Sequence, residues 1–295
     1  MDYVGYGVMG QISYEGMELP GGYHLEQDRN FGYFKVIPRP SDEEIAEYYG
    51  NQYQMPIAPH DHENRVGVVC GMHPQPGRIL DIGCGVGDLL EVFRHRGWEV
   101  VGVEPGKKEA LAARNKNIDV IEDMLTNSVV ERIGTFDAVF LINVLEHSLR
   151  PEEMVDMVRR LLVPGGIFCC EVPNDFNSLQ EVAASVCNLE PWWINPPAHL
   201  NYFSIESLSA FVAGQGFDVL LETTDFPVEM FLLGGDIYID NQEIGGQMHA
   251  KRCRFEEAMR GEGKGKLLQD LYDAMAKLGI GRKAIVYARK REGAR

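Results

Sequence analysis

The stretch Ile79–Leu90, which reads ILDIGCGVGDLL, decides the fold and the ligand class of this chain. It predicts a buried strand over 78–82 that turns sharply through GCGVG into a helix beginning at Asp88. Glycine permits such a turn and lets the backbone approach a ligand closely, and the helix N-terminus adds unpaired N–H donors at the same place. Because a dinucleotide fingerprint reads G-x-G-x-x-G, the tighter spacing here makes a nicotinamide-dependent oxidoreductase the weaker alternative.

Strand-length apolar runs alternate with helical stretches on both sides of this loop. Apolar strands separated by helices are typical of a parallel sheet that is covered on both faces. The pattern therefore predicts an α/β fold with a doubly wound, mostly parallel sheet of seven strands. These are 78–82, 99–103, 119–121, 136–142, 166–172, 217–222 and 283–289.

Two acids stand close to the glycine loop. Asp81 lies two positions before Gly83, and Glu104 ends the next predicted strand, 17 residues beyond Gly87. A carboxylate at the position of Glu104 can accept both hydroxyls of a ribose, as in other nucleoside-binding α/β folds. The alternative is a surface acid at a strand end. The glycine spacing and the acid together favour a nucleoside-containing ligand.

The order of motifs over 78–172 resembles that of class I S-adenosylmethionine-dependent methyltransferases. Asp81–Gly87 matches the first motif of the family, and Glu104 matches its ribose-binding acid. Further matches are the loop at 122–124, the NVLEH segment at 143–147 and the LLVPGG turn at 161–166. The resemblance implies a Rossmann-like methyltransferase fold, S-adenosylmethionine as cofactor and S-adenosylhomocysteine as product. The cofactor-binding residues that it implies are Asp81, Gly83, Cys84, Gly85, Gly87, Glu104, Pro105, Asp123, Met124, Asn143, Val144 and Tyr53.

A second resemblance concerns the segments outside these motifs. The AHLNYFS run at 198–204, before a capped helix, is similar to a branch whose members methylate sugars, polyketides and quinone-like phenols. Many relatives carry a zinc ribbon before a Pro-Arg-Pro-Ser sequence and a helix rich in tyrosine. This chain keeps that sequence at 38–41 and a tyrosine-rich stretch at 48–53, but it has no cysteine before Cys70. We therefore expect no zinc site and regard the N-terminal segment as a cap over the cofactor.

Two histidines are candidates for the catalytic base. Removing the proton of an acceptor hydroxyl needs a base near the methyl donor. His147 follows the fourth predicted strand, and His199 lies in the segment after the fifth. The alternatives are that His147 only orders its loop or contacts the methionine moiety, and that His199 only stabilises its loop. No group of histidines and carboxylates has the spacing of a metal site.

Aromatic residues crowd the segment around His199. Trp192, Trp193 and Tyr202 could form a wall for a planar or sugar-like acceptor. The alternative is that they form the core of the insertion. The sequence does not decide between the two.

Composition limits the partners of the protein. The chain has 295 residues, a net charge of −16 and a pI near 4.9. Such a charge repels phosphate backbones, so we expect no nucleic-acid substrate. No signal peptide or membrane span is apparent, and six cysteines without a C-x-x-C pair suggest reduced thiols. We expect a cytoplasmic enzyme that acts on a small-molecule acceptor without a membrane partner, and a homodimer is conceivable.

The expected organisation has three parts. Residues 1–76 form an N-terminal cap and connector, and 77–225 with 280–291 form the methyltransferase core. Insertions at 174–203 and 226–279 shape the acceptor pocket. The leading functional hypothesis is O-methylation of a sugar or secondary-metabolite hydroxyl. An N- or C-methyltransferase and a catalytically silent cofactor-binding scaffold are the alternatives.

Overall fold

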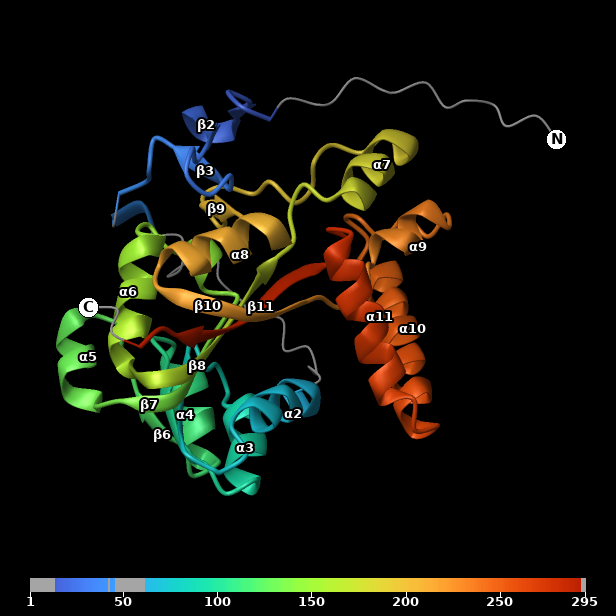
Figure 1. Cartoon of the computed structure of the whole chain (residues 1–295). Coiled ribbons are helices and arrows are strands. Elements are labelled where there is room, and N and C mark those ends of the chain that lie inside the picture. Colours follow the sequence, from blue (N-terminus) through green and yellow to red (C-terminus); the bar gives the residue numbers. More distant parts are fainter. Residues whose placement is uncertain (1–13, 42, 46–61, 293–295) are drawn as a thin grey trace.

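A computed structural model gives the arrangement of residues 14–41, 43–45 and 62–292. Its main feature is a seven-stranded sheet in the order β10-β11-β8-β7-β4-β5-β6, which confirms the predicted fold class (Figure 1). The strands are β4 (Arg78–Ile82), β5 (Glu99–Val103), β6 (Asp119–Ile121), β7 (Phe136–Ile142), β8 (Leu162–Pro173), β10 (Phe217–Thr223) and β11 (Lys283–Lys290). Neighbouring strands from β6 to β8 pair in parallel, whereas β11 is antiparallel to both β8 and β10.

Side chains that alternate along the strands build a core on each face of the sheet, because successive Cβ atoms of a strand point to opposite sides. Leu80 and Leu141 face one core, and Ile79 and Phe140 face the other. The helices over the first core are α5 (Asn127–Ile133), α6 (Pro151–Leu161) and α8 (Ile205–Gly214). Those over the second core are α2 (His62–Met72), α3 (Asp88–His95) and α4 (Lys107–Asn115). The sheet is therefore doubly wound, as predicted.

The chain reverses its direction across the sheet between β4 and β7. It runs outward from β4 through β5 to β6 and then returns to pair β7 with β4. Ligands of doubly wound sheets bind beyond the carboxyl ends of the strands at such a switch point. The glycine loop follows β4 directly, so the topology places it at the binding crevice.

A second, smaller sheet joins the N-terminal segment to the first insertion. Its order is β1-β2-β3-β9, with β1 (Glu18–Leu19), β2 (Tyr23–Gln27) and β3 (Phe34–Ile37) from the N-terminus and β9 (Asn201–Tyr202) from the insertion; a 3₁₀ turn, η1 (Pro20–Gly22), separates β1 from β2. Arg39 strengthens the junction by donating to the Leu200 carbonyl at 2.7 Å and to Asn201 Oδ1 at 2.6 Å. The described N-terminal residues therefore lie on the insertion rather than on the glycine loop.

The C-terminal half adds helices beyond the sheet. Helix α7 (Ser178–Cys187), which the sequence analysis did not predict, contacts α9 (Glu229–Leu233). Helices α10 (Gln242–Gly261) and α11 (Gly265–Lys277) run side by side at one end of the sheet (Figure 1). None of the described helices is long and apolar enough to cross a membrane.

Candidate functional site

The glycine loop has the tight geometry that its sequence demands. Gly83, Gly85 and Gly87 have φ angles of 76°, 52° and 79°, in the region that disfavours other residues. A Cβ atom on Gly87 would lie 2.5 Å from Ile118 Cδ1 and 3.0 Å from Ala113 Cβ of α4, so a side chain there would force these neighbours to shift. A Cβ atom on Gly85 would meet nothing within 4 Å. The middle of the loop therefore leaves open space where a ligand can approach the backbone.

Glu104 is fixed at the loop by two backbone donors. Its Oε2 accepts the Gly85 N–H at 2.8 Å, and its Oε1 accepts the Gly106 N–H at 2.7 Å. Burial raises the pKa of Glu104, although these two hydrogen bonds oppose the increase. A carboxylate held in this way still has lone pairs for the hydroxyls of a ribose. The placement agrees with the role that the resemblance implies.

Asp81 is a second buried acid beneath the loop. Burial, together with the nearby Glu104 charge, raises the pKa of Asp81 to about 8. A carboxyl group in this environment binds a positively charged group favourably, because the cation offsets its desolvation. S-adenosylmethionine carries a sulfonium and an ammonium group, so its charge fits this pair of acids.

The other predicted cofactor residues that the structure describes lie in the loops that follow β4, β5, β6 and β7. Asn143 has a φ of 52°, and Val144 Cγ2 lies 2.7 Å from the Cβ position of Gly83. Cys84 is buried, Met124 is 59% exposed, and Pro105 and Asp123 lie on exposed loops after β5 and β6. Tyr53 lies outside the described residues, so its predicted role has no structural counterpart here.

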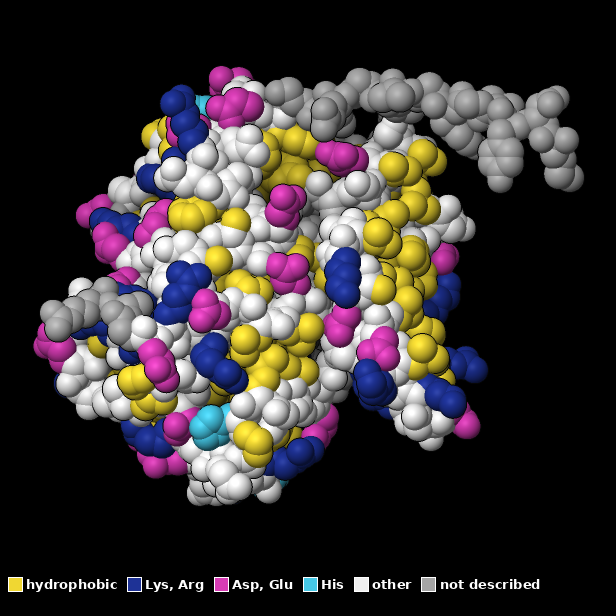
Figure 2. All heavy atoms as spheres, in the orientation of Figure 1, with side chains coloured by type: hydrophobic (Ala, Val, Ile, Leu, Met, Phe, Trp, Pro, Cys, Tyr) yellow, Lys and Arg dark blue, Asp and Glu magenta, His cyan; other side chains and the backbone are white. Residues whose placement is uncertain are grey.

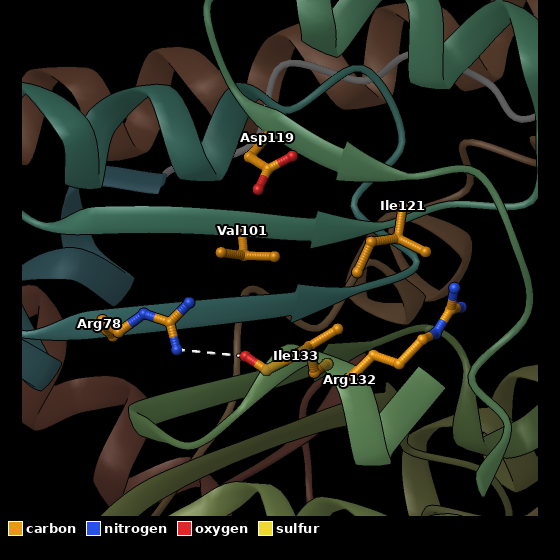
Figure 3. A pocket seen from close by; sticks show the side chains of 6 residues that line it. All are labelled: Arg78, Val101, Asp119, Ile121, Arg132 and Ile133. Atoms are coloured by element: carbon orange, nitrogen blue, oxygen red, sulfur yellow. Dashed lines mark hydrogen bonds between the residues drawn. The ribbon is translucent and has the colours of Figure 1, made fainter. Parts of the chain in front are cut away.

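A surface cavity of about 320 Å³ lies elsewhere on the sheet. It is lined by Arg78, Val101, Asp119, Ile121, Arg132 and Ile133, and Arg78 donates to the Ile133 carbonyl at 3.2 Å (Figure 3). Arg78 begins β4, whereas the glycine loop follows its last residue. The cavity is therefore not the crevice that the loop and Glu104 define.

The two candidate bases lie against each other although they are distant in the sequence. The ring centroids of His147 and His199 are 5.0 Å apart. His147, in the turn η2 (Leu145–His147), has its Nδ1 2.6 Å from the Ala198 carbonyl. Because a carbonyl oxygen only accepts, Nδ1 carries a proton, and the lone pair of the neutral ring is at Nε2. Burial lowers the pKa of His147 and lowers that of His199 to about 4, so both rings are neutral at pH 7.

A carboxylate completes this group. Glu146, His147 and His199 each offer one ligand atom within 4.8 Å of the others. Burial raises the pKa of Glu146 to about 8, and its Oε2 has no hydrogen-bond partner among the described residues. Two imidazoles and a carboxylate form a donor set that divalent cations accept. The sequence analysis expected no metal site and did not identify this donor set, because His199 reaches it only through the folding of the insertion.

The predicted aromatic wall is largely packed inside the insertion. Tyr202 is fully buried, and its hydroxyl donates to the His199 carbonyl at 3.1 Å and accepts the Asn195 N–H at 3.0 Å. Trp193 is 7% exposed, and Trp192 packs against it with ring centroids 4.9 Å apart. This packing favours the alternative that the three aromatics are the core of the insertion, while the contact of Tyr202 with His199 keeps them near the candidate base.

Four charged groups at the carboxyl edge of the sheet were not singled out in the sequence analysis. They are Asp175, Asp225 and Glu229 with Arg282, and each lies at the end of a sheet strand or in the adjoining helix. Two of them, Asp175 and Asp225, follow closely after predicted strands. That position was the one signal that could have identified them, because binding crevices form at such ends.

Apolar side chains also gather on the outer side of the C-terminal helices (Figure 2). Val182 and Val186 on α7, and Met230 and Leu233 on α9, are between 38% and 69% exposed. Exposed apolar patches are common at protein interfaces.

Comparison with known proteins places the chain among methyltransferases. A family model described as "Methyltransferase domain" matches residues 64–222, more than half of the chain. A ubiquinone biosynthesis O-methyltransferase of Caulobacter sp. (strain K31) is 30% identical over 48% of this chain and 60% of its own length. One from Alkalilimnicola ehrlichii is 37% identical over 30% of this chain and 38% of its own length. The chain thus spans about three-fifths or less of these curated relatives.

Solved structures agree on the fold. A 1,6-didemethyltoxoflavin N1-methyltransferase of Burkholderia thailandensis, with bound S-adenosylhomocysteine, is 13% identical at a TM-score of 0.51, covering 94% of this chain and 99% of that one. The [4+2]-cyclase SpnF is 19% identical at a TM-score of 0.50, and the match covers 87% of this chain and 99% of the cyclase. At these identities the likeness establishes the fold alone.

Proposed function

The chain belongs to the methyltransferase-domain family, and from this premise we propose that it transfers the methyl group of S-adenosylmethionine to a hydroxyl group of a small molecule. The family match confirms the class I S-adenosylmethionine-dependent assignment and the cofactor expected from the sequence. One observation carries the proposal. The Glu104 carboxylate is bonded to the Gly85 N–H beside open space, at the switch point of the sheet.

The proposed chemistry asks little of the protein beyond positioning and one proton transfer. When bound, the cofactor supplies a methyl group that its sulfonium charge already activates. The protein holds the acceptor oxygen in line with that methyl group, which supplies much of the rate. His147 would take the proton at Nε2, because the Ala198 carbonyl keeps its Nδ1 protonated. His199, against the same ring, would position the acceptor or share the base role.

The acceptor is proposed to lie beneath the insertions. Residues 77–225 with 280–291 would form the core, 1–76 the N-terminal cap, and 174–203 with 226–279 the walls of the acceptor pocket. The hydroxyl of a sugar or secondary metabolite is the leading acceptor. The relatives named for ubiquinone O-methylation support an oxygen acceptor but cover only part of the chain.

Two alternatives deserve a test. An N- or C-methyltransferase would keep the same cofactor site, since the acceptor atom is not encoded there. A catalytically silent scaffold would also keep this site and would bind the cofactor without turnover.

A divalent cation at Glu146, His147 and His199 would change the proton transfer, because a bound cation acidifies a coordinated hydroxyl. Under this variant turnover is lost on chelation and restored by Mg²⁺, Mn²⁺ or Zn²⁺. If His147 acts as a base without a metal, chelation leaves turnover unchanged. Turnover measured with and without a chelator therefore separates the metal-assisted from the metal-free proton transfer.

Binding and turnover test the proposal in sequence. We expect micromolar binding of S-adenosylhomocysteine by calorimetry and none of NAD. Labelled methyl transfer is then measured into a panel of sugar nucleotides, phenols and amines. A folded sample that binds neither S-adenosylmethionine nor S-adenosylhomocysteine contradicts the proposal, and binding without any turnover favours the scaffold. Light scattering on the same sample tests whether the chain forms a homodimer.

A further inference from the structure

Two acids flank Arg282 at the carboxyl edge of the sheet. Arg282 precedes β11, which lies between β8 and β10. On one side the Asn174 N–H donates to the Arg282 carbonyl at 2.9 Å, and on the other the Thr224 hydroxyl donates to the Lys283 carbonyl at 2.6 Å. Asp175 directly follows Asn174, and Asp225 directly follows Thr224. The strand register therefore brings both acids next to the start of β11.

Glu229 and Tyr238 reach the same place from the second insertion. Glu229 begins α9 and is 1% exposed. Its charge interacts with those of Arg282 and Asp225, and Tyr238 interacts with both Glu229 and Arg282. We call Asp175, Asp225, Glu229 and Tyr238, with Arg282, the acidic cluster. It adjoins the candidate bases, because Arg282 also acts on His199.

The acidic cluster has buried oxygen atoms that lack partners. Asp175 Oδ2, Asp225 Oδ1, Glu229 Oε2 and the Tyr238 hydroxyl are inaccessible and have no hydrogen bond within the described part of the chain. Asp175 is 2% exposed, so its free oxygen lies well inside the protein. An unpartnered buried polar atom is costly. Four such atoms around one arginine point to a ligand that supplies hydrogen-bond donors.

Charge favours a cationic ligand. Three carboxyls face Arg282. The two further cations that act on Asp225, Lys283 and Arg252, are shared with other acids. Lys283 pairs with the buried Glu171, and Arg252 lies 3.6 Å from Asp225 but also 3.7 Å from Glu256. Burial raises the pKa of Asp175, Asp225 and Glu229, as expected for carboxyls without enough counter-charge. An ammonium group would offset part of this excess of negative charge. An uncharged, apolar acceptor would leave these oxygens unpaired.

We propose that the acidic cluster binds a positively charged amine of the acceptor, so that the substrate class is a hydroxylated amine rather than an uncharged phenol. This inference rests on the proposed function. The His147 loop follows β7, and two strand spacings, about 10 Å, separate β7 from β11. The methylated hydroxyl would therefore lie over the histidines, with the amine some way across the sheet edge.

Matched pairs of small molecules test the inference. Tyramine and tyrosol differ only in an ammonium group for a hydroxyl, as do glucosamine and glucose. Each is titrated into the protein by calorimetry, with and without saturating S-adenosylhomocysteine. We expect the amine of at least one pair to bind at least tenfold more tightly than its neutral partner. The inference is overturned if both amines bind no more tightly than their neutral partners. It is also overturned if neither amine binds at concentrations up to roughly 10 mM, which is near the weak end of measurable affinities.

Isosteric variants assign the preference to the acidic cluster. Glu229→Gln and the double variant Asp225→Asn/Glu229→Gln should reduce the amine preference to less than threefold and leave S-adenosylhomocysteine affinity unchanged. Glu206→Gln, an exposed acid on α8, is the matched control. An amine preference that survives in a folded Glu229→Gln variant overturns the assignment. Failure to bind S-adenosylhomocysteine contradicts the proposed function instead, so the two failures are distinguishable.

Discussion

The two halves of the carboxyl edge of the sheet are built in opposite ways. On the β4–β5–β6 side, the glycine loop and Glu104 lie close in the sequence, and Glu104 bonds directly to the loop. On the β7–β8–β11–β10 side, His199, Asp175 and Arg282 come from distant segments, and several buried oxygens have no partner among the described residues. The first half is complete before a ligand arrives, whereas the second has polar groups that a ligand would satisfy.

This difference matches two kinds of ligand. A methyl donor shared by a whole family can be bound by short loops that any member retains, because the donor does not change. An acceptor differs from member to member, and insertions over a constant sheet are the economical way to vary it. Substitutions in one half should therefore leave the affinity of the other half for its ligand unchanged.

The largest expected effect lies on the acceptor side. His147→Ala should lower kcat at saturating cofactor by about 10² to 10⁴-fold, because a positioned base contributes that much to proton transfer. The Kd of S-adenosylhomocysteine should change little, since the ring bonds to the insertion and not to the glycine loop. Rapid-quench turnover with calorimetry measures both. If His147→Ala and His199→Ala each retain full kcat, another group or water removes the proton.

The next effect concerns a buried ion pair on the β7–β8–β11–β10 side. Glu171 on β8 is fully buried and accepts Arg65 of α2 at 2.7 Å and Lys283 of β11. These cations lower the pKa of Glu171 to about 2, which is worth about 3 kcal/mol of folding free energy at pH 7. Glu171→Gln should lose about that much in urea unfolding, because two buried cations lose their partner.

The sign of the pH dependence follows from the lowered pKa. A carboxylate whose folded pKa lies below its unfolded value stabilises the fold above about pH 4.5, and that stability is lost as the pH falls toward 2. The difference in the free energy of unfolding between wild type and Glu171→Gln should therefore decrease as the pH falls from 4.5 to 2. The exposed Glu153→Gln is the control and should stay within about 0.5 kcal/mol. A constant gap across this range would show that the ion pair is not its cause.

A smaller effect is expected on the cofactor side. Glu104→Ala should weaken S-adenosylhomocysteine binding by about tenfold to hundredfold, as for loss of hydrogen bonds to a charged group, and leave kcat at saturation unchanged. Glu104→Gln should cost less, because its amide oxygen can still accept one of the two backbone N–H groups. Unchanged affinity in a folded Glu104→Ala protein would show that the ribose assignment is wrong.

The smallest effect is a pH dependence of cofactor affinity. Asp81, with a pKa raised to about 8, is largely protonated at pH 7 when no cation is near. A positively charged ligand favours the ionised form of Asp81, so binding of the ligand releases a proton. The affinity should therefore rise between pH 6 and 8, by up to about tenfold per pH unit. Calorimetry of S-adenosylmethionine in two buffers of different ionisation enthalpy measures this release. Asp81→Asn should abolish it, and a pH-independent Kd in the wild type would exclude Asp81 as the titrating group.

The same contrast between the two halves explains which parts of the fold and of the candidate site could be predicted from the sequence. The strands were predictable because each buried strand is a continuous apolar run, and the glycine loop because its turn needs residues that tolerate positive φ. Helix α7 was missed, although its Asn177–Gln180 capping box is present, because the Pro-rich and aromatic run after it suggested an irregular insertion.

The sequence by itself determined the sheet, the glycine loop and the acid that faces it, because all three depend on residues that are near one another along the chain. Only the tertiary structure decided that His147 meets His199, that Tyr202 is buried, and that Asp175 and Asp225 flank Arg282. The physical reason is range. These contacts join separate segments through the register of β11 between β8 and β10 and the folding of an insertion onto the sheet edge, and neither leaves a local pattern in the chain.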